Sequence, residues 1–247
     1  MIVQSVTSPA VARRPRAFLG VTGPDAADYL QRMVSNDVEA LAPGSRCDAL
    51  LLTPKARVIA PLRVLRRGDE DFLVLTEPEL GEPVRTQLLR AKFAAKVEIE
   101  PEEHESWLVL GGEEVVDERP EGEEADELEV ERRRIEAGVP RWGHEIDERV
   151  LPAEAGLDET HVSFSKGCYP GQEPIARQRY RGKVNRKLRV LDVEGEAEQG
   201  DELLHEGKAV GRITSAVPGV ALAFVRVEVP QDAELQFAAK PGSARLR

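Results

Sequence analysis

The chain has 247 residues, with 45 Asp and Glu against 34 Lys and Arg, and a formal net charge of −11. This length supports a sizeable core and predicts two or three compact units. No apolar stretch reaches the roughly 18 residues that a membrane span needs, so the sequence argues against a transmembrane protein.

The first segment, residues 1–24, contains Arg13, Arg14 and Arg16 and no acidic residue. This composition resembles a transit peptide only faintly, and it lacks the apolar region of a secretory signal. Because folded-looking sequence begins by Phe18, we expect an ordinary N-terminal arm followed by a strand.

Helical and strand patterns alternate in the next part of the chain. Apolar residues recur at helical spacing from Ala26 to Val34 and alternate with a period of two from Val58 to Val64. The segments expected as helices are 22–35 and 78–91, and those expected as strands are 47–53, 57–65, 72–76, 96–100 and 106–110.

A strongly acidic run follows, with eleven acidic residues and one arginine from Glu113 to Glu131. Such charge density is typical of solvated surface, so we expect a flexible loop in this run. Residues 132–140 are expected to form a short element that ends at Gly138 and Pro140.

The pattern changes after about Arg186. Short apolar runs recur between glycines, without a helical period, which predicts a small all-β barrel or sandwich. Because mixed helices and strands precede it, we expect at least two domains.

The segment KGCYPGQEPIAR, residues 166–177, combines several chemically active side chains. Two Gly and two Pro within nine residues predict an irregular loop rather than a strand or a helix interior. Cys168 has little local cover, and the surrounding stretch 166–189 has eight Lys and Arg against one Glu. Positive charge favours the thiolate, so Cys168 is a candidate nucleophile or metal ligand; a half-buried cysteine in a turn is the alternative.

The other cysteine, Cys47, lies in an expected strand, and we expect it in the core. Two distant cysteines without C-x-x-C spacing, and four scattered histidines, argue against a disulfide scaffold and against a permanent metal or iron–sulfur site built from this chain alone. This cysteine usage favours a reducing compartment, the cytoplasm.

The motif at 166–177 resembles the signature of the YgfZ family of folate-binding proteins, which are related to the glycine-cleavage T-protein (aminomethyltransferase). Further segments match in order between residues 17 and 226. They are GPDAADYLQ (23–31), SNDV (35–38), ALLLTPKARV (49–58), RIEAGVPRWG (134–143) and ETHVSFSKGCY (159–169).

The resemblance implies a three-lobed, aminomethyltransferase-like α+β fold around a central folate pocket. The folate-binding region would cover 1–185, as two interwoven lobes (1–45 with 112–185, and 46–111), and a C-terminal β-barrel domain would cover 186–247. The implied role is the assembly or maintenance of iron–sulfur enzymes, including radical enzymes that thiolate tRNA. The implied partners are therefore iron–sulfur client enzymes or assembly proteins, with a transient iron–sulfur contact through Cys168.

The implied cofactor is tetrahydrofolate or a one-carbon derivative, and five residues correspond to its site. The Glu136 carboxylate can accept two hydrogen bonds from the aminopyrimidine edge of a pterin, and the Trp142 ring offers a face for stacking. Asn36 lies in the turn that resembles the pocket-facing turn of the family, and Lys166 and Arg177 are expected to face the glutamate tail. From chemistry alone, the alternatives are a solvated Glu136, a core Trp142 and a surface Arg177.

Two other functions are weighed against this one. A tetrahydrofolate-dependent aminomethyltransferase or demethylase of an amine is the main alternative, but it requires an aspartate after the second strand. Residues 49–68 contain no Asp or Glu, with Pro61 near the expected carboxylate, so the usual contribution of about 10²–10⁴ from general acid–base catalysis is missing. An RNA-binding surface from Arg177 to Arg189 would include a single aromatic residue, Tyr180, which argues against direct nucleic-acid binding.

Overall fold

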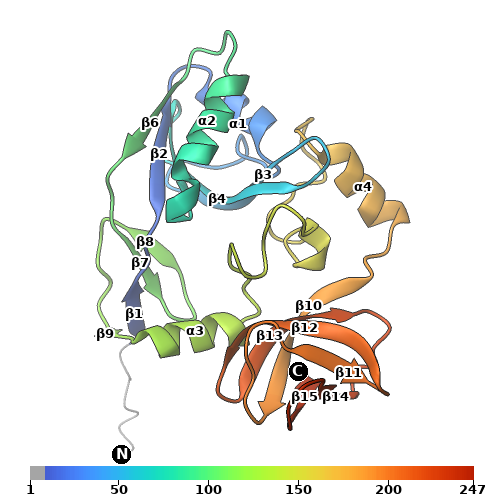
Figure 1. Cartoon of the computed structure of the whole chain (residues 1–247). Helices are drawn as coiled ribbons and strands as arrows, with labels where there is room; N and C mark the ends of the chain where they lie inside the picture. The colour runs from blue at the N-terminus through green and yellow to red at the C-terminus, as the bar shows by residue number, and fades with distance from the viewer. Residues whose placement is uncertain (1–8) are drawn as a thin grey trace, which may run out of the picture.

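The structure is a computed structural model that describes residues 9–247 (Figure 1). Residues 1–8, the start of the segment compared above with a transit peptide, lie outside the described residues. The described chain forms a five-stranded sheet, a four-stranded sheet and a closed barrel, joined by helices, which confirms the α+β class.

The five-stranded sheet is antiparallel throughout and has the order β3-β4-β5-β2-β6. Its strands are β2 (Ala17–Thr22), β3 (Arg46–Leu52), β4 (Val58–Arg66), β5 (Asp71–Thr76) and β6 (Glu98–Glu102). The expected lobes, 1–45 with 112–185 and 46–111, therefore share this sheet, because β2 lies between β5 and β6.

Helices α1 (Ala26–Met33) and α2 (Gly81–Ala91), the latter preceded by the short helix η1 (Pro78–Leu80), contribute to the core of this sheet. The apolar face of α1 is buried as expected, but the helix begins four residues later than the sequence predicts. Gly23 has a φ of +124°, which a helix cannot contain.

The four-stranded sheet includes part of the acidic run, and the connection 117–122 within the run has no regular secondary structure. Its order is β8-β7-β1-β9, with β1 at Ala10–Arg13, β7 at Ser106–Val109, β8 at Glu114–Val116 and β9 at Glu123–Glu124. Helix α3 (Glu127–Glu136) begins within the same run, and the Asp126 side chain caps it by accepting a hydrogen bond from the Glu129 N–H at 2.8 Å. Strands and a helix therefore take up much of the run, and several of its acidic groups have specific partners, among them Glu114 with arginines and Asp126 with the start of α3.

The C-terminal strands close into the barrel β10-β13-β12-β11-β14-β15, which confirms the all-β prediction. The strands are β10 (Arg186–Glu194), β11 (Glu202–His205), β12 (Lys208–Val217), β13 (Val220–Arg226), β14 (Glu234–Phe237) and β15 (Ser243–Leu246). Ile135 of α3 packs on Val217, Val220 and Leu222, which joins α3 to the outside of the barrel.

The short helix η2 (Pro152–Glu154) lies between the five-stranded sheet and the barrel (Figure 1). Helix α4 (Gln172–Arg181) lies beside the turn between β3 and β4, and the chain continues from it to β10 (Figure 1). The expectation of an irregular loop through 177 is wrong, because α4 begins at Gln172. Pro174 lies in the first turn of α4, where the missing N–H has no helical partner to lose.

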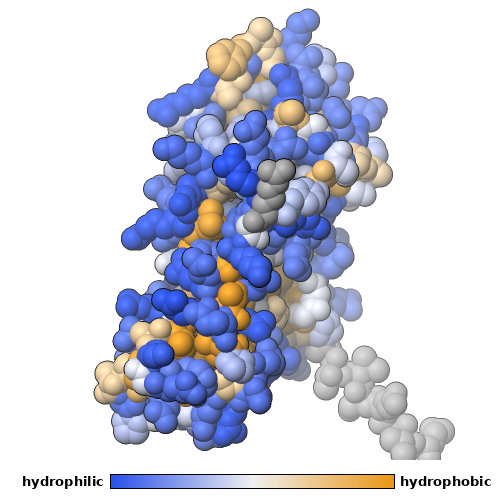
Figure 2. Space-filling view, turned by 90° about the vertical axis from the view of Figure 1, so that its right-hand side faces the viewer, coloured by the Kyte–Doolittle hydropathy of each residue, from blue (hydrophilic) through white to orange (hydrophobic). Residues whose placement is uncertain are grey.

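Figure 2 looks onto the side of α4 and the barrel, where hydrophobic atoms form a band from the middle of the face to the barrel between hydrophilic neighbours. Within residues 9–247, no helix combines the length and the apolar character that crossing a membrane requires.

Candidate functional site

A cavity of about 1930 Å³ lies where the two sheets, α4 and the barrel meet. Its lining comes from β1, β3 and β4, from α3 and the turn after it, from residues 152–161, and from α4 and β10. Segments far apart in the sequence therefore form one enclosure. Among the described residues, no group of three or more His, Cys, Asp or Glu is arranged to hold a metal ion.

Two of the five expected folate residues line this cavity. Glu136 is the last residue of α3, and in the described part of the chain its carboxylate has neither a hydrogen bond nor an ion pair. Trp142 is half-buried, and it packs against both the core of the five-stranded sheet and the neighbouring core around Leu50 and Tyr169. An unengaged carboxylate and a flat aromatic face are thus available in the same cavity.

Asn36 does not line the cavity but connects residues of its wall. Its amide N–H groups donate to the carbonyl oxygens of Asp48 at 2.7 Å and Thr160 at 3.2 Å. Its side-chain oxygen accepts a hydrogen bond from the Asp37 N–H at 2.9 Å. Since Asp48 and Thr160 line the cavity, Asn36 has a structural role in its wall.

Lys166 is buried outside the cavity, with 8% of its surface exposed. Its ammonium donates to the carbonyls of Gln31, Val34 and Asn36 at the C-terminal end of α1. Burial lowers the pKa of this group to about 8. The ammonium is therefore engaged in binding the end of α1, and this structure does not bring it to a ligand in the cavity.

Arg177 lies on the exposed side of α4 and does not line the cavity, whereas Arg179 of the same helix does. The Arg179 guanidinium stacks 4.0 Å from the centroid of the Phe164 ring. The helical course of α4 is the reason, because residues two apart on a helix point in different directions.

Cys168 is a free, exposed thiol that lies outside the cavity lining. The residues around it are fixed: Lys166 binds the end of α1, and Tyr169 is buried against Leu50 and Leu52. Gly171 has a φ of +85°, and a Cβ there would lie 2.7 Å from the carbonyl oxygen of Thr53. The thiol is thus held at the surface by anchored neighbours on both sides.

Cys47 is half-buried on β3 and lines the cavity, and burial raises the pKa of its thiol to about 12. It is packed against the core of the five-stranded sheet, as expected, although it is only partly buried. The two thiols of the chain therefore differ in exposure.

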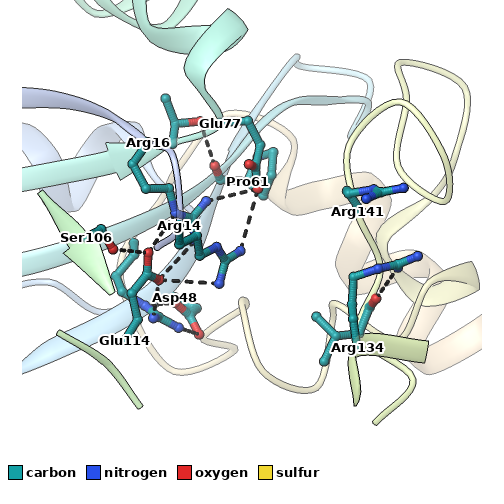
Figure 3. Close-up of polar contacts among 12 residues, drawn as sticks. Arg14, Arg16, Asp48, Pro61, Glu77, Ser106, Glu114, Arg134 and Arg141 are labelled. Carbon is teal, nitrogen blue, oxygen red and sulfur yellow. Dashed lines mark hydrogen bonds and ion pairs between the residues drawn. The ribbon is translucent and has the colours of Figure 1, made fainter. Parts of the chain in front are cut away.

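Sequence analysis missed an ion cluster on the cavity wall (Figure 3). The Glu114 side chain is fully buried and pairs with Arg14 at 3.4 Å, Arg16 at 2.8 Å and Arg63 at 2.7 Å. It also accepts a hydrogen bond from the Ser106 hydroxyl at 2.7 Å. Figure 3 shows Arg134 and Arg141 on the opposite side of the drawn space.

The cluster includes Asp48, which is joined to Arg63 by two hydrogen bonds of 2.7 and 3.0 Å. Burial acts to raise the pKa of each acid, but the arginines outweigh it: the pKa of Glu114 falls to about 2, and the pKa of Asp48 is also lowered. Both carboxylates are therefore ionised at neutral pH and poor proton acceptors.

Weak signals for this cluster exist in the sequence. Asp48 directly precedes the acid-free stretch 49–68, and Glu114 precedes two valines that begin a strand pattern. Arg14 and Arg16 fall in the segment that was compared with a transit peptide. Nothing local indicates that these groups meet, because they are separated by up to 100 positions.

The comparisons with known proteins agree with this architecture. A family model described as the CAF17 C-terminal beta-barrel domain matches residues 185–247. The solved structure of glycine cleavage system aminomethyltransferase T from Bartonella henselae superposes with a TM-score of 0.83 over 98% of this chain and 85% of that chain. Its sequence identity is 16%, so this likeness concerns the fold, and the expected aminomethyltransferase-like fold is confirmed.

Relatives extend the likeness to sequence. An uncharacterised protein of Haemophilus influenzae is 30% identical over 89% of either chain. The mitochondrial iron-sulfur cluster assembly factor IBA57 homolog of Neurospora crassa is 24% identical over 89% of this chain and 70% of its own length. The tRNA-modifying protein YgfZ of Escherichia coli K12 is 25% identical over 71% of this chain and 69% of its own length.

Aminomethyltransferases of Rippkaea orientalis and a Nostoc species are 28% and 27% identical, over 87% and 92% of this chain. The chain spans about half the length of these two enzymes, 51% and 55%.

Proposed function

The chain belongs to the YgfZ family, which is related to the aminomethyltransferases, and we propose that it is a folate-binding protein that supports iron–sulfur enzymes through Cys168. The observation that carries the proposal is the separation of two features. A large cavity contains Glu136 and Trp142, and an exposed thiol lies outside it on an anchored loop.

The proposed cofactor is tetrahydrofolate or a one-carbon derivative, bound in the cavity. The cavity exceeds the ~300–1,000 Å³ of typical small-molecule sites, so it has room for a pterin and its tail. The free Glu136 carboxylate would accept two hydrogen bonds from the aminopyrimidine edge, and Trp142 would stack on the pterin. Asn36 would act indirectly, by holding Asp48 and Thr160 in the wall.

Cys168 is proposed to contact iron–sulfur client enzymes or assembly proteins, including enzymes that modify tRNA. One thiol cannot hold a cluster alone, so the partner protein must supply the remaining ligands. The names of the IBA57 and YgfZ relatives support this class of partner. An exposed free thiol also suits a reducing compartment, and we propose the cytoplasm.

In this proposal, residues 1–185 form the folate-binding region and residues 186–247 the barrel domain.

The alternative function, one-carbon transfer, is less well supported. Asp48 is a carboxylate of the cavity wall, but its two hydrogen bonds to Arg63 and its lowered pKa make it a weak base.

The first experiment is an anaerobic calorimetric titration of tetrahydrofolate into the wild type, Glu136→Ala and Cys168→Ala. We expect saturable binding that falls at least about tenfold in Glu136→Ala, because a bidentate charged contact is lost. Binding to Cys168→Ala should match the wild type, because Cys168 does not line the cavity. Glu127→Ala is the matched control, an exposed acid on the same helix outside the cavity. No binding by the wild type would reject the folate site.

The second readout is the activity of iron–sulfur enzymes in cells that lack the native protein. Cys168→Ala should fail to restore it, whereas Cys47→Ala should restore it. Full restoration by Cys168→Ala would reject the role of this thiol while leaving the folate result untouched.

A further inference from the structure

The turn that follows α1, residues 34–36, contacts two parts of the chain that line the cavity. The first part is β3. The Leu50 N–H donates to the Ser35 hydroxyl at 2.8 Å, and the Asn36 side chain donates to the Asp48 carbonyl at 2.7 Å. Asp48 lines the cavity and Ser35 is fully buried, so the turn is fixed to the cavity wall from behind.

The second part is the segment 160–166. The Asn36 side chain also donates to the Thr160 carbonyl at 3.2 Å, and the Ser35 hydroxyl donates to the His161 carbonyl at 2.6 Å. Thr160 and His161 both line the cavity. One side-chain amide, that of Asn36, therefore holds two carbonyl groups that belong to different parts of the cavity wall.

The far end of this segment is bound to the same turn by Lys166. Its ammonium donates to the carbonyls of Val34 at 2.8 Å and Asn36 at 2.7 Å, and the residue is 8% exposed. Cys168 follows two residues later in the chain. The loop that carries the thiol is therefore anchored to the turn that also holds the cavity wall.

The anchor has a second accessible state, in which the Lys166 amine is neutral. Burial lowers the pKa of Lys166 to about 8, although Asp37, Cys47 and Glu39 act to raise it. A neutral amine binds backbone carbonyls less strongly than an ammonium does. An element with two accessible states is what coupling between two sites requires.

We propose that Asn36 is a positioning residue that couples ligand in the cavity to the order of the Cys168 loop. Ligand that fixes the wall at Asp48 and Thr160 restrains the Asn36 side chain and, with it, the carbonyls that receive Lys166. The loop then loses less entropy when Lys166 stays bound, so its opening becomes rarer. This inference rests on the proposed function and assigns the regulation of its thiol.

The test is hydrogen exchange of the wild type under anaerobic conditions, with and without saturating tetrahydrofolate. We expect exchange in residues 166–171 to slow about fivefold with tetrahydrofolate, although none of these residues lines the cavity. The β11–β12 hairpin, residues 205–208, is the internal control, because it lies in the barrel and also outside the cavity lining. Exchange in the hairpin should stay unchanged.

The variant Asn36→Ala should lose the effect of tetrahydrofolate on residues 166–171, because the two carbonyls of the wall lose their link to the turn. It is compared with the wild type at concentrations that give the same occupancy. Asp37→Ala is the matched control, since the Asp37 side chain accepts from Gln31 and from the Ala40 N–H instead. This control should keep the effect.

Lys166→Met keeps the inference testable where Asn36→Ala does not fold. It should show fast exchange in residues 166–171 with and without tetrahydrofolate, because the loop loses its anchor to the turn. An effect of tetrahydrofolate that persists in folded Asn36→Ala or in Lys166→Met would overturn the inference.

Two results from the wild type alone would also overturn it while leaving the proposed function intact. One is binding of tetrahydrofolate with unchanged exchange in residues 166–171. The other is equal slowing in these residues and in the hairpin, which would show general stabilisation. No binding of tetrahydrofolate by the wild type would instead reject the folate site itself, and the inference with it.

Discussion

The Glu114 carboxylate is fully buried and contacts Arg14, Arg16 and Arg63 together with the Ser106 hydroxyl. Arg14 and Arg16 lie in or beside the connection from β1 to β2, Arg63 is on β4, and Ser106 begins β7. One carboxylate therefore links the four-stranded sheet to the five-stranded sheet at the cavity wall.

We expect Glu114→Ala to lower the free energy of unfolding by about 3–5 kcal/mol, because three arginines would lose a buried counter-charge. Guanidinium denaturation of the purified variant measures this. The adjacent Glu113→Ala should cost under about 0.5 kcal/mol, since the Glu113 side chain is 77% exposed and, among the residues that the structure describes, forms an ion pair with Arg46 alone. Similar losses in the two variants would contradict a special role for Glu114.

Among the secondary-structure elements, β6 and the residue that follows β8 are linked by the side chain of His104. Its Nδ1 lies 2.6 Å from the Asp117 carboxylate and its Nε2 lies 2.7 Å from the Glu102 carboxylate, which also pairs with Arg67. Both ring nitrogens can donate only when the imidazole is protonated. Partial burial lowers the pKa of His104, but the two carboxylates outweigh burial and raise it above its ordinary value.

The pKa of His104 is higher in the folded state than the value of 6.5 in the unfolded state. The two ion pairs of the protonated imidazole therefore stabilise the fold fully below pH 6.5, and this stabilisation is lost as the pH rises through the folded-state pKa. Between about pH 6 and about pH 9, the wild type should lose up to about 1 kcal/mol more stability than His104→Gln. Urea denaturation at both pH values measures the difference. His205→Gln, in the barrel, should behave like the wild type; a pH dependence unchanged in His104→Gln would refute the assignment.

The elements also differ in how well local sequence predicts them. The first helix and the barrel strands follow their apolar periodicity, because one face of each is buried. Composition does not predict that Glu114 of the acidic run is buried, nor that a helix begins within the segment 166–177. Glu114 is buried by arginines from other strands, and the helix from Gln172 begins at a glycine whose conformation is set against Thr53.

At the scale of the whole molecule, Glu145 joins the cavity region to the barrel. Its buried carboxylate pairs with Arg134 of α3 at 3.0 Å and accepts hydrogen bonds from the Arg141 N–H at 3.0 Å and the Ser215 hydroxyl of β12 at 2.6 Å. The apolar contact of Ile135 with the barrel lies on the same helix as Arg134. Glu145 thus links the helix that positions Glu136 to the barrel.

We expect Glu145→Ala to lower the free energy of unfolding by about 3 kcal/mol, because Arg134 and Ser215 lose their buried partner. Hydrogen exchange should rise in α3 and in β12 near Ser215, and change little in the five-stranded sheet. Glu148→Ala, a nearby exposed acid, is the control. Unchanged exchange in α3 and β12 would show that apolar packing alone holds the barrel.

Local periodicity predicted the first helix and the strands of the barrel, and the motif around Cys168 made that thiol a candidate. The α+β class, Glu136 and Trp142 were expected from the resemblance to the YgfZ family, which also rests on segments that are contiguous in the chain. The folded chain was needed to show that Glu136 and Trp142 share one cavity and that Lys166 and Asn36 bind backbone carbonyls instead. It also showed that Arg179 rather than Arg177 lines the cavity. Those outcomes depend on which distant groups meet, and the electrostatic and hydrogen-bonding partners that bury a charge are supplied by other strands and helices.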